Sequence, residues 1–292
     1  MSTPYAGVEL GGTKCVCTLA GGPDAVLARE TIPTTNPEET LGRIGALLER
    51  WRDGEGVRAL GVASFGPVDL DTASSTWGSI TTTPKPGWAG TDVARRLQQA
   101  ARAPVAFDTD VNGAALAEMR WGAGRGLSDF AYVTVGTGIG VGLIVNGAAT
   151  RGFAHCELGH VRVARLPGDD WPGVCPYHGG CVEGLASGPA IKARLAGRPL
   201  AELGDDNPLW EGVAHALAQM CHVIVCAAAP RRIAIGGGVM KGQPHLLPRI
   251  EALLVESLAG YMTLPAGRPY LTAPGLGAEA GPLGSIALAM TA

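Results

Sequence analysis

The sequence has few charged and few aromatic side chains, and it has no strong charge of either sign. Charged residues make up 17% of the 292 positions, aromatic residues make up 5%, and the formal net charge is −3. A chain without a basic surplus lacks the electrostatic footprint for nucleic acid, so we expect no nucleic-acid partner. No apolar run approaches the roughly 20 residues that span a membrane, so we expect no membrane partner.

The start of the chain lacks the features of an export signal. The segment "MSTPYAGVEL" has neither a basic stretch nor a long apolar core before a cleavage site, which predicts a cytoplasmic protein. Seven cysteines is an odd number for a disulfide framework, so we expect reduced thiols, some of them bound to metal. The length favours two domains and is sufficient for an enzyme.

Short apolar stretches bounded by glycine or proline alternate with amphipathic ones along the whole chain. The first half predicts strands at 5–10, 15–20, 25–32, 59–64 and 105–107, and helices at 37–52, 91–101 and 111–121. The second half predicts strands at 130–135, 141–145, 232–235 and near 270, helices at 209–228 and 246–258, and a final helix. Both halves follow one plan, β-β-β-α-β-α-β-α, which predicts an α/β fold of two lobes.

The two lobes are expected at 1–108 and 109–278. The C-terminal helix, 279–292, is expected to complete the first and smaller lobe, and the larger lobe carries a long irregular insert at 152–186. In each half the first two strands meet at a glycine turn. We therefore expect both turns to face one cleft between the lobes.

Three glycine turns, "GGTK" at 11–14, "GTG" at 136–138 and "GGGV" at 236–239, offer exposed amides without side-chain bulk. Such turns hold phosphate oxygens, although any one of them taken singly is more often a plain hairpin turn. None is a Walker loop, because GxxxxGK[ST] does not occur, and "GTGIGVG" fails the GxGxxG spacing. The third turn follows a strand and precedes a helix, a position that suits a nucleotide.

Asp110, in "DTDVNGAALAE", stands where a buried strand ends and a helix begins. Its structural interpretation is a helix cap, a role that Asp performs well. Its functional interpretation is a general base, since phosphoryl transfer from ATP needs a carboxylate beside the attacking hydroxyl. Spacing alone favours neither the helix cap nor the general base.

A cluster of soft ligands lies in the insert, within "HCELGH" and "CPYHGGC". His160, Cys175, His178 and Cys181 supply two imidazoles and two thiolates, a set that suits tetrahedral Zn²⁺. Four protein ligands leave no open position, so the ion would be structural. A redox pair is disfavoured because the cysteines are not spaced C-x-x-C, and isolated buried cysteines are the remaining alternative. Glu157 and Glu183 flank the ligands and are expected to bind hydroxyl groups.

Seven segments in order resemble the ROK family of sugar kinases, and within it the bacterial fructokinases, over nearly the whole chain. They are "GVELGGTK", "GVASFGPVDL", "GSITTTPKPGW", "DTDVNGAALAE", "VTVGTGIGVGLIVNG", "HCELGH…CPYHGGCVEGLASGPAI" and "IAIGGGVM". The resemblance implies an actin-like ATPase, ribonuclease H-like fold and phosphorylation of D-fructose by ATP at the 6-hydroxyl. It also implies Mg²⁺ with the ATP, a structural Zn²⁺ and a homodimer.

The resemblance also implies the site residues. It makes Asp110 the base, with Glu9 near the Mg²⁺ through water. The implied sugar-binding residues are Thr83, Lys85, Trp88, Thr109, Asp110, Glu157, His160 and Glu183. The implied ATP-binding residues are Gly11, Gly12, Thr13, Lys14, Gly136, Thr137, Gly138, Pro189, Gly236, Gly237 and Gly238. His160 would then belong to both the metal and the sugar site.

Departures from the family pattern bear on the sugar. Most members of the family have Asp at the position of Glu9, and they bind zinc with one histidine and three cysteines rather than two of each. Both of these departures are also the fructokinase pattern. Thr109 stands where glucokinases are expected to have an Asn. Cys156 replaces a proline and has no functional explanation. Mannokinase, glucokinase and N-acetylmannosamine kinase activities are the alternatives. A non-catalytic sugar sensor is another, and the family's winged-helix repressors are disfavoured because the first strand is expected to begin at Tyr5.

Overall fold

The computed structural model describes residues 3–292, which form two compact units. The first unit runs to Gly126 and includes 149–156 and 278–292; the second comprises 127–148 and 157–277. These bounds differ from the predicted lobes because helix α3 (Asp110–Trp121) packs on α9 (Ala280–Ala289) in the first unit. A Cβ on Gly284 of α9 would lie 2.6 Å from the carbonyl carbon of Gly113 in α3. The lobe division itself stays a prediction.

The first unit is built on a five-stranded sheet in the order β3-β2-β1-β4-β5. β1 pairs antiparallel with β2 and parallel with β4, so the first strands form a meander and the later ones return through helices. The elements before α3 are β1 (Tyr5–Leu10), β2 (Lys14–Ala20), β3 (Val26–Pro33), α1 (Pro37–Gly54), β4 (Leu60–Ser64), α2 (Ala94–Ala101) and β5 (Val105–Thr109).

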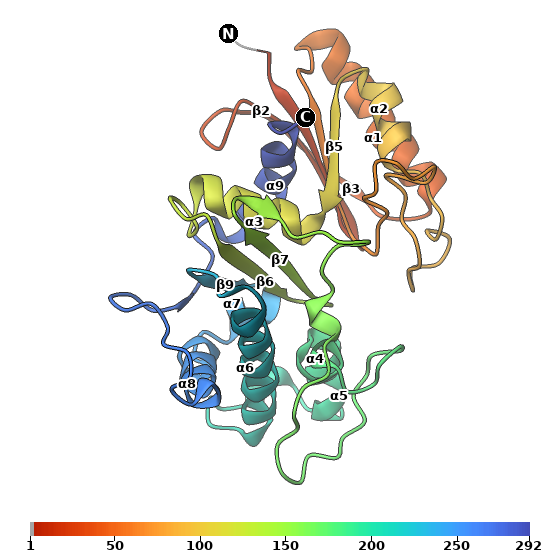
Figure 1. The fold of residues 1–292 in the computed structure, drawn as a ribbon. Coiled ribbons are helices and arrows are strands. Elements are labelled where there is room, and N and C mark those ends of the chain that lie inside the picture. Colours follow the sequence, from red (N-terminus) through yellow and green to blue (C-terminus); the bar gives the residue numbers. More distant parts are fainter. Residues whose placement is uncertain (1–2) are drawn as a thin grey trace. The chain divides into compact units, whose positions relative to one another are not determined.

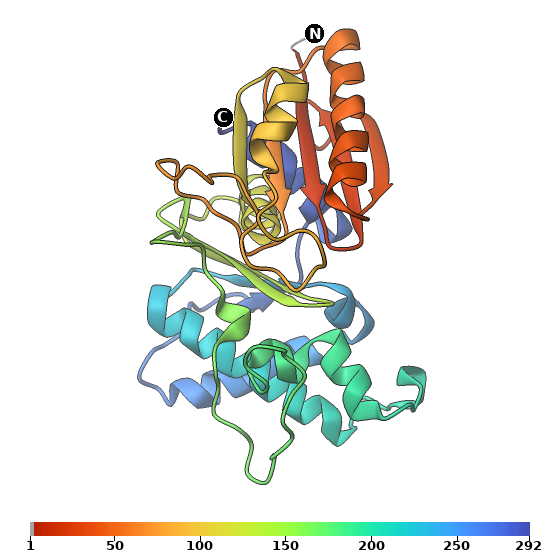
Figure 2. The same cartoon turned by 90° about the vertical axis from the view of Figure 1, so that its right-hand side faces the viewer.

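Helix α1 begins where its sequence predicts. The side chain of Asn36 accepts the N–H of Glu39 at 2.9 Å, and Pro37 occupies the first turn, where its missing donor costs nothing. Its apolar residues recur at helical spacing and are buried in the core of this unit. α1 and α2 lie over one face of the sheet and α9 over the other (Figures 1 and 2). The sheet therefore has an apolar layer on both faces.

We expect Gly61→Ala to lower the free energy of unfolding by about 3 kcal/mol, as overpacking does. Gly61 lies in β4, and a Cβ there would lie 1.9 Å from the carbonyl oxygen of Ser285 in α9. Urea denaturation measures the change. Gly42→Ala, in α1 with nothing within 4 Å, is the matched control and should be neutral or stabilising by up to about 1 kcal/mol. Equal stability of Gly61→Ala and wild type would contradict the packing of α9 on β4.

The second unit repeats this plan. Its sheet has the order β10-β9-β6-β7-β8, so its first three strands and its last two take the places of β1 to β5. The predicted α/β fold with a duplicated plan is confirmed, and the third strand, missed in the sequence, is only two residues long. The elements are β6 (Phe130–Val135), β7 (Ile139–Val145), β8 (Ala148–Ala149), α4 (Val182–Ala186), α5 (Gly188–Leu195), α6 (Pro208–Ala228), β9 (Ile233–Gly236), α7 (Gly238–Gly242), α8 (Leu246–Leu258) and β10 (Leu271–Thr272).

Helix α6 corrects one expectation from the sequence. By length and composition it is apolar enough to cross a membrane, whereas we expected no such stretch. Half of its apolar window is buried within the protein, where α6 packs against α4 and α8. A helix that is apolar on most sides is also what the centre of a large core requires.

Other differences are local. Helix α2 begins at Ala94 rather than at 91, because Asp92 forms an isolated bridge with Ser79. The end of the insert and the residues after it form α4 and α5, which were expected to be irregular. Each has a side-chain cap, Cys181 for α4 and Ser187 for α5. Neither helix exceeds eight residues, too short for a periodic apolar pattern to stand out.

Candidate functional site

The first glycine turn joins β1 to β2 and is held by hydrogen bonds within the turn and from Thr34. The N–H of Gly11 donates to the carbonyl of Lys14 at 3.2 Å, which closes the turn. Thr34 donates its hydroxyl to Gly11 O at 2.7 Å and its N–H to Thr13 O at 2.9 Å. With these carbonyls occupied, Gly12 and Thr13 are left exposed. The turn is a fixed platform of the kind that suits phosphate oxygens.

The predicted sugar loop lies beside this turn in the same unit. Lys85 donates its ammonium to the carbonyl of Gly12 at 2.6 Å, and its N–H reaches the hydroxyl of Thr83 at 3.3 Å. Trp88 is placed differently. It is fully buried, donates its indole N–H to Thr35 O at 2.9 Å and meets Phe65 edge to face. Trp88 therefore supports the loop from the core and presents no free ring face to a ligand.

Asp110 is the first residue of α3, at the end of β5. The cap of that helix is Thr109, whose buried hydroxyl accepts the N–H of Asn112 at 3.2 Å. The alternative interpretation of Asp110 as the cap is thereby corrected. Its carboxylate accepts the N–H of Val111 at 2.8 Å, and the residue is half-buried. The Thr109 hydroxyl accepts in this cap, so its own O–H remains a donor.

Asp108 fixes the junction between β5 and α3, and sequence analysis missed it. Its buried carboxylate accepts the N–H of Thr109 at 2.7 Å and the amide of Asn112 at 2.8 Å, and it pairs with Arg151. These partners satisfy the oxygen atoms of a carboxylate that is buried. The only signal in the sequence is an acidic residue at the end of an apolar strand; its cationic partner is 43 residues away.

Glu9 is the penultimate residue of β1 and lies near Asp110. Burial, followed by repulsion from Asp110, raises the pKa of Glu9 to about 7. Lys14 and Arg29 oppose this shift, while Glu279, paired with Arg29 at 2.6 Å, adds to it. Two carboxylates that raise each other's energy in this way are stabilised by a cation between or beside them. The pair is therefore suited to the water shell of a divalent ion.

We expect Glu9 to make the folded state less stable as the pH rises from about 4.5 to 7. Its pKa is 4.5 ordinarily and about 7 in the folded protein, so over this range the unfolded chain loses a proton that the folded one keeps. The difference in unfolding free energy between wild type and Glu9→Gln should fall across that window by up to roughly 3 kcal/mol and then level off. Denaturation of nucleotide-free, magnesium-free protein from pH 4 to 8 measures it. Parallel curves would contradict the shift; the exposed Glu256→Gln is the control.

The second glycine turn joins β6 to β7 in the other unit. Gly136 N–H donates to Gly138 O at 2.9 Å, and Thr137 is exposed at the tip. Gly188, which begins α5, donates its N–H to Gly136 O at 2.8 Å. Pro189 therefore lies directly beside this turn, at the positive end of a helix. Amides, a hydroxyl and a helix N-terminus together form a site suited to anions.

The third turn meets the second. Gly237 has φ +94°, and a Cβ there would lie 2.4 Å from the carbonyl oxygen of Val135, the residue before the second turn. Only glycine fits such a position. Gly236 and Gly238 flank it at the end of β9 and the start of α7. The structure thus brings together the predicted ATP-binding residues of this unit: Gly136, Thr137, Gly138, Pro189, Gly236, Gly237 and Gly238.

The four predicted metal ligands converge in the second unit. The ligand atoms of His160, Cys175, His178 and Cys181 all lie within 4.8 Å of one another. Cys175 Sγ is 3.6 Å from His160 Nδ1 and 3.7 Å from His178 Nδ1, and Cys181 Sγ is 3.6 Å from His160 Nδ1. A tetrahedral zinc ion with ordinary bond lengths places sulfur and nitrogen about 3.6 Å apart. The residues fit zinc.

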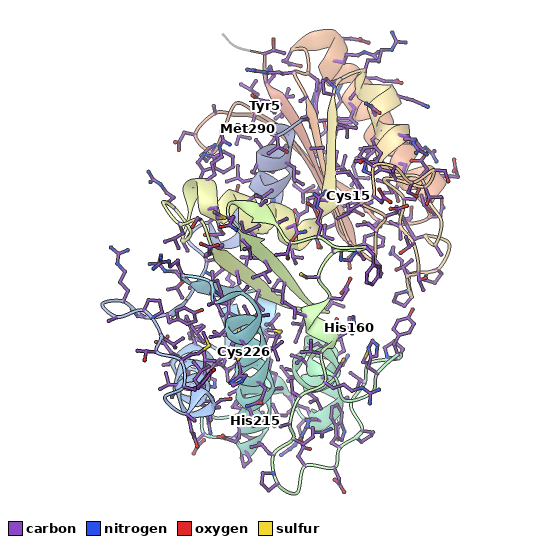
Figure 3. The ribbon with its side chains drawn as sticks, in the orientation of Figure 1. Tyr5, Cys15, His160, His215, Cys226 and Met290 are labelled. Carbon is purple, nitrogen blue, oxygen red and sulfur yellow. The ribbon has the colours of Figure 1, made fainter. Side chains whose placement is uncertain are left out.

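The carboxylates that flank the ligands lie in this unit too. Glu183 Oε1 is 3.9 Å from Nε2 of His160, the ring nitrogen that faces away from the thiols. Its other oxygen accepts the N–H of Ile139 at 3.0 Å, immediately after the second glycine turn. Glu157 is exposed just before the short 3₁₀ turn that carries His160, labelled in Figure 3. Sugar-binding and metal-binding candidates are therefore neighbours.

Each unit thus holds one part of the chemistry. The first carries two carboxylates and a glycine turn, and the second carries two glycine turns, a metal cluster and two further carboxylates. A base, exposed amides for phosphate and carboxylates for hydroxyl groups are the parts that phosphoryl transfer to an alcohol needs. That the two parts face one cleft stays a prediction.

Comparison with known proteins gives matches over nearly the whole chain. A family model described as ROK family matches residues 5–292. The chain is 42% identical to the fructokinase of Zymomonas mobilis, covering 99% of this chain and 97% of the relative. It is 39% identical to the fructokinase of Pediococcus pentosaceus, with 98% and 97% covered. Among solved structures, a ROK family glucokinase from Streptomyces griseus in complex with glucose and AMPPNP is 26% identical, with a TM-score of 0.78 and 99% and 100% covered.

Proposed function

The chain belongs to the ROK family, and from this premise we propose that it is a fructokinase that transfers the γ-phosphoryl group of ATP to the 6-hydroxyl of D-fructose. The observation that carries the choice of sugar is the similarity to named fructokinases over almost the full length of both chains. Thr109, which stands where glucokinases are expected to have an amide, supports the choice. The gathering of glycine turns in the second unit supports ATP as the donor.

In the proposed reaction Asp110 accepts the proton of the 6-hydroxyl. The sugar oxygen then forms a bond to the γ-phosphorus as the bond from that phosphorus to the leaving ADP oxygen breaks. The carboxylate of Asp110 is held by Val111 N–H at the start of a helix whose cap and preceding residue are fixed by buried hydrogen bonds. Such support keeps a base within the narrow range of positions that proton transfer requires.

Other residues bind and orient. Gly11, Gly12, Thr13 and Lys14 of the first turn and the amides of the second and third turns hold the phosphates. Glu9 would hold the water shell of the Mg²⁺ that accompanies ATP, an ion that would neutralise phosphate charge. Thr83, Lys85, Glu157, His160 and Glu183 hold the sugar hydroxyl groups. Closure around the substrates excludes water that would otherwise hydrolyse ATP.

We also propose that the enzyme is a cytoplasmic homodimer with structural zinc, as the family resemblance implies. Sedimentation measures the assembly, and metal analysis measures the zinc. Neither result bears on the choice of sugar, so the assembly and the zinc content can be judged separately from the substrate.

A coupled assay of ADP release tests the function directly. Fructose, mannose, glucose and N-acetylmannosamine are compared with Mg·ATP on protein of known zinc content. We expect fructose to have the highest kcat/KM by about tenfold or more. A higher value for another sugar would overturn the choice of fructose but keep the kinase. Zinc-loaded protein that phosphorylates none of the four would support a sugar sensor instead.

A further inference from the structure

Glu183 joins the metal cluster to the second glycine turn. One carboxylate oxygen lies 3.9 Å from Nε2 of His160, whose other ring nitrogen faces the two thiols at 3.6 Å. The other oxygen accepts the N–H of Ile139 at 3.0 Å. A Cβ on Gly138 would lie 2.8 Å from that same oxygen. One side chain therefore contacts a metal ligand and the residues that end the turn.

The metal-binding segment supports the turn at two further points. Gly159, directly before His160, approaches so closely that a Cβ there would lie 1.8 Å from the carbonyl oxygen of Ile139. Gly188, the first residue of α5 and two residues after the end of α4, donates its N–H to Gly136 O. Gly184 in α4 packs equally closely against the loop between Cys175 and Cys181, since a Cβ on Gly184 would lie 1.8 Å from the carbonyl oxygen of Gly179. The turn has little room to adjust unless this segment moves with it.

We propose that Glu183 is a positioning residue through which occupancy of the metal site sets the affinity of the second turn for nucleotide. This inference rests on the proposed function, and it concerns nucleotide binding in the absence of sugar. With a metal held by its Nδ1, the His160 ring would keep Nε2 on the side of Glu183, 3.9 Å away, in the histidine–carboxylate arrangement common at metal sites. The carboxylate in turn fixes Ile139 N–H and so the direction of the turn's amides. Without the ion the ring is free to rotate, and the amides lose that support.

A coupling of this kind is reciprocal. If zinc raises nucleotide affinity by some factor, nucleotide must raise zinc affinity by the same factor. Couplings between sites commonly amount to about fivefold or more. Equality of the two factors shows that both titrations measure one closed thermodynamic cycle, and the Glu183→Gln variant then tests whether the coupling passes through this side chain.

The test uses the full chain and AMPPNP with Mg²⁺, without sugar. Calorimetry gives the Kd of AMPPNP for zinc-loaded and zinc-stripped protein, and competition with a chelating dye gives the Kd of zinc with and without AMPPNP. We expect both ratios to be about fivefold or more and equal to each other. Equal AMPPNP affinity in the two forms would overturn the coupling and leave the proposed function standing. No AMPPNP binding to zinc-loaded protein would overturn both.

Glu183→Gln, studied in the zinc-loaded form, keeps the inference testable if stripped protein unfolds. Its amide oxygen can still accept Ile139 N–H, but it cannot pair with His160 as a carboxylate does. We expect AMPPNP to bind about fivefold or more weakly. Simple electrostatics predicts the opposite, since removing a negative charge beside a phosphate site should tighten binding, so unchanged or tighter binding would overturn the inference. Asp170→Asn, an exposed charge change within the insert, is the control and should bind as wild type does.

Discussion

Asp110→Asn is expected to lower kcat by about two to four orders of magnitude while the protein stays folded. Asparagine has the same shape as aspartate and can still accept Val111 N–H, a contact of 2.8 Å in the wild type. It cannot accept the proton of an attacking hydroxyl. The cap of α3 is Thr109, so the helix keeps its start. The variant should therefore bind fructose and AMPPNP with affinities close to those of wild type.

Three measurements separate a lost base from a damaged fold. Steady-state kinetics gives kcat, calorimetry gives the affinities, and thermal unfolding gives Tm. Asp71→Asn removes an exposed carboxylate from a loop of the same unit and should leave all three unchanged. Near-normal kcat in Asp110→Asn would remove Asp110 as the base. A large fall in Tm with a matching loss of both affinities would assign it a structural role instead.

The fold could be predicted from the sequence where the deciding interactions are local. The first two strands are apolar segments separated by a short glycine turn. The register that pairs Tyr5 with Ala20 and Leu10 with Cys15 follows from the length of that turn. Helix α1 was predictable because its cap and its first proline are adjacent. The duplicated plan was visible because each half begins with such a hairpin. These features depend on neighbours along the chain.

What the sequence could not show depends on contacts between distant residues. Lys85 holds the first turn through a carbonyl 73 positions away, and Arg151 pairs with an aspartate 43 positions away. Trp88 stands in a segment that resembles a sugar loop, yet its ring is buried in the core. No pattern in that segment tells a ligand-facing ring from a core ring. The metal cluster was the exception, because four soft ligands at short spacing carry their own chemistry.

Cys181→Ser is expected to lose stoichiometric zinc and to weaken fructose binding by about tenfold or more. Cys181 is fully buried, its sulfur lies 3.6 Å from Nδ1 of His160, and its side chain also caps α4. Serine is chosen because it can still cap a helix, so the loss of the thiolate ligand is isolated from the loss of the cap. Metal analysis gives the zinc content and calorimetry gives the affinity for fructose. Cys226→Ser, at an exposed cysteine in α6, is the control and should leave both unchanged.

The expected effect follows from the small amount of regular secondary structure in the segment around the ligands. Between Glu157 and Cys181 the described structure has one 3₁₀ turn and isolated bridges but no strand, and Tyr177 is exposed. Asp169 pairs with Arg165 and Arg194 in or beside this segment, and a bound metal would add a direct link between its two ends, as in small zinc domains. His160 and Glu183 are two of the proposed sugar-binding residues; His160 lies near the start of this segment, and Glu183 follows its last ligand by two residues, in α4. A variant that has lost zinc but binds fructose with wild-type affinity would show that the segment holds these two residues without the metal.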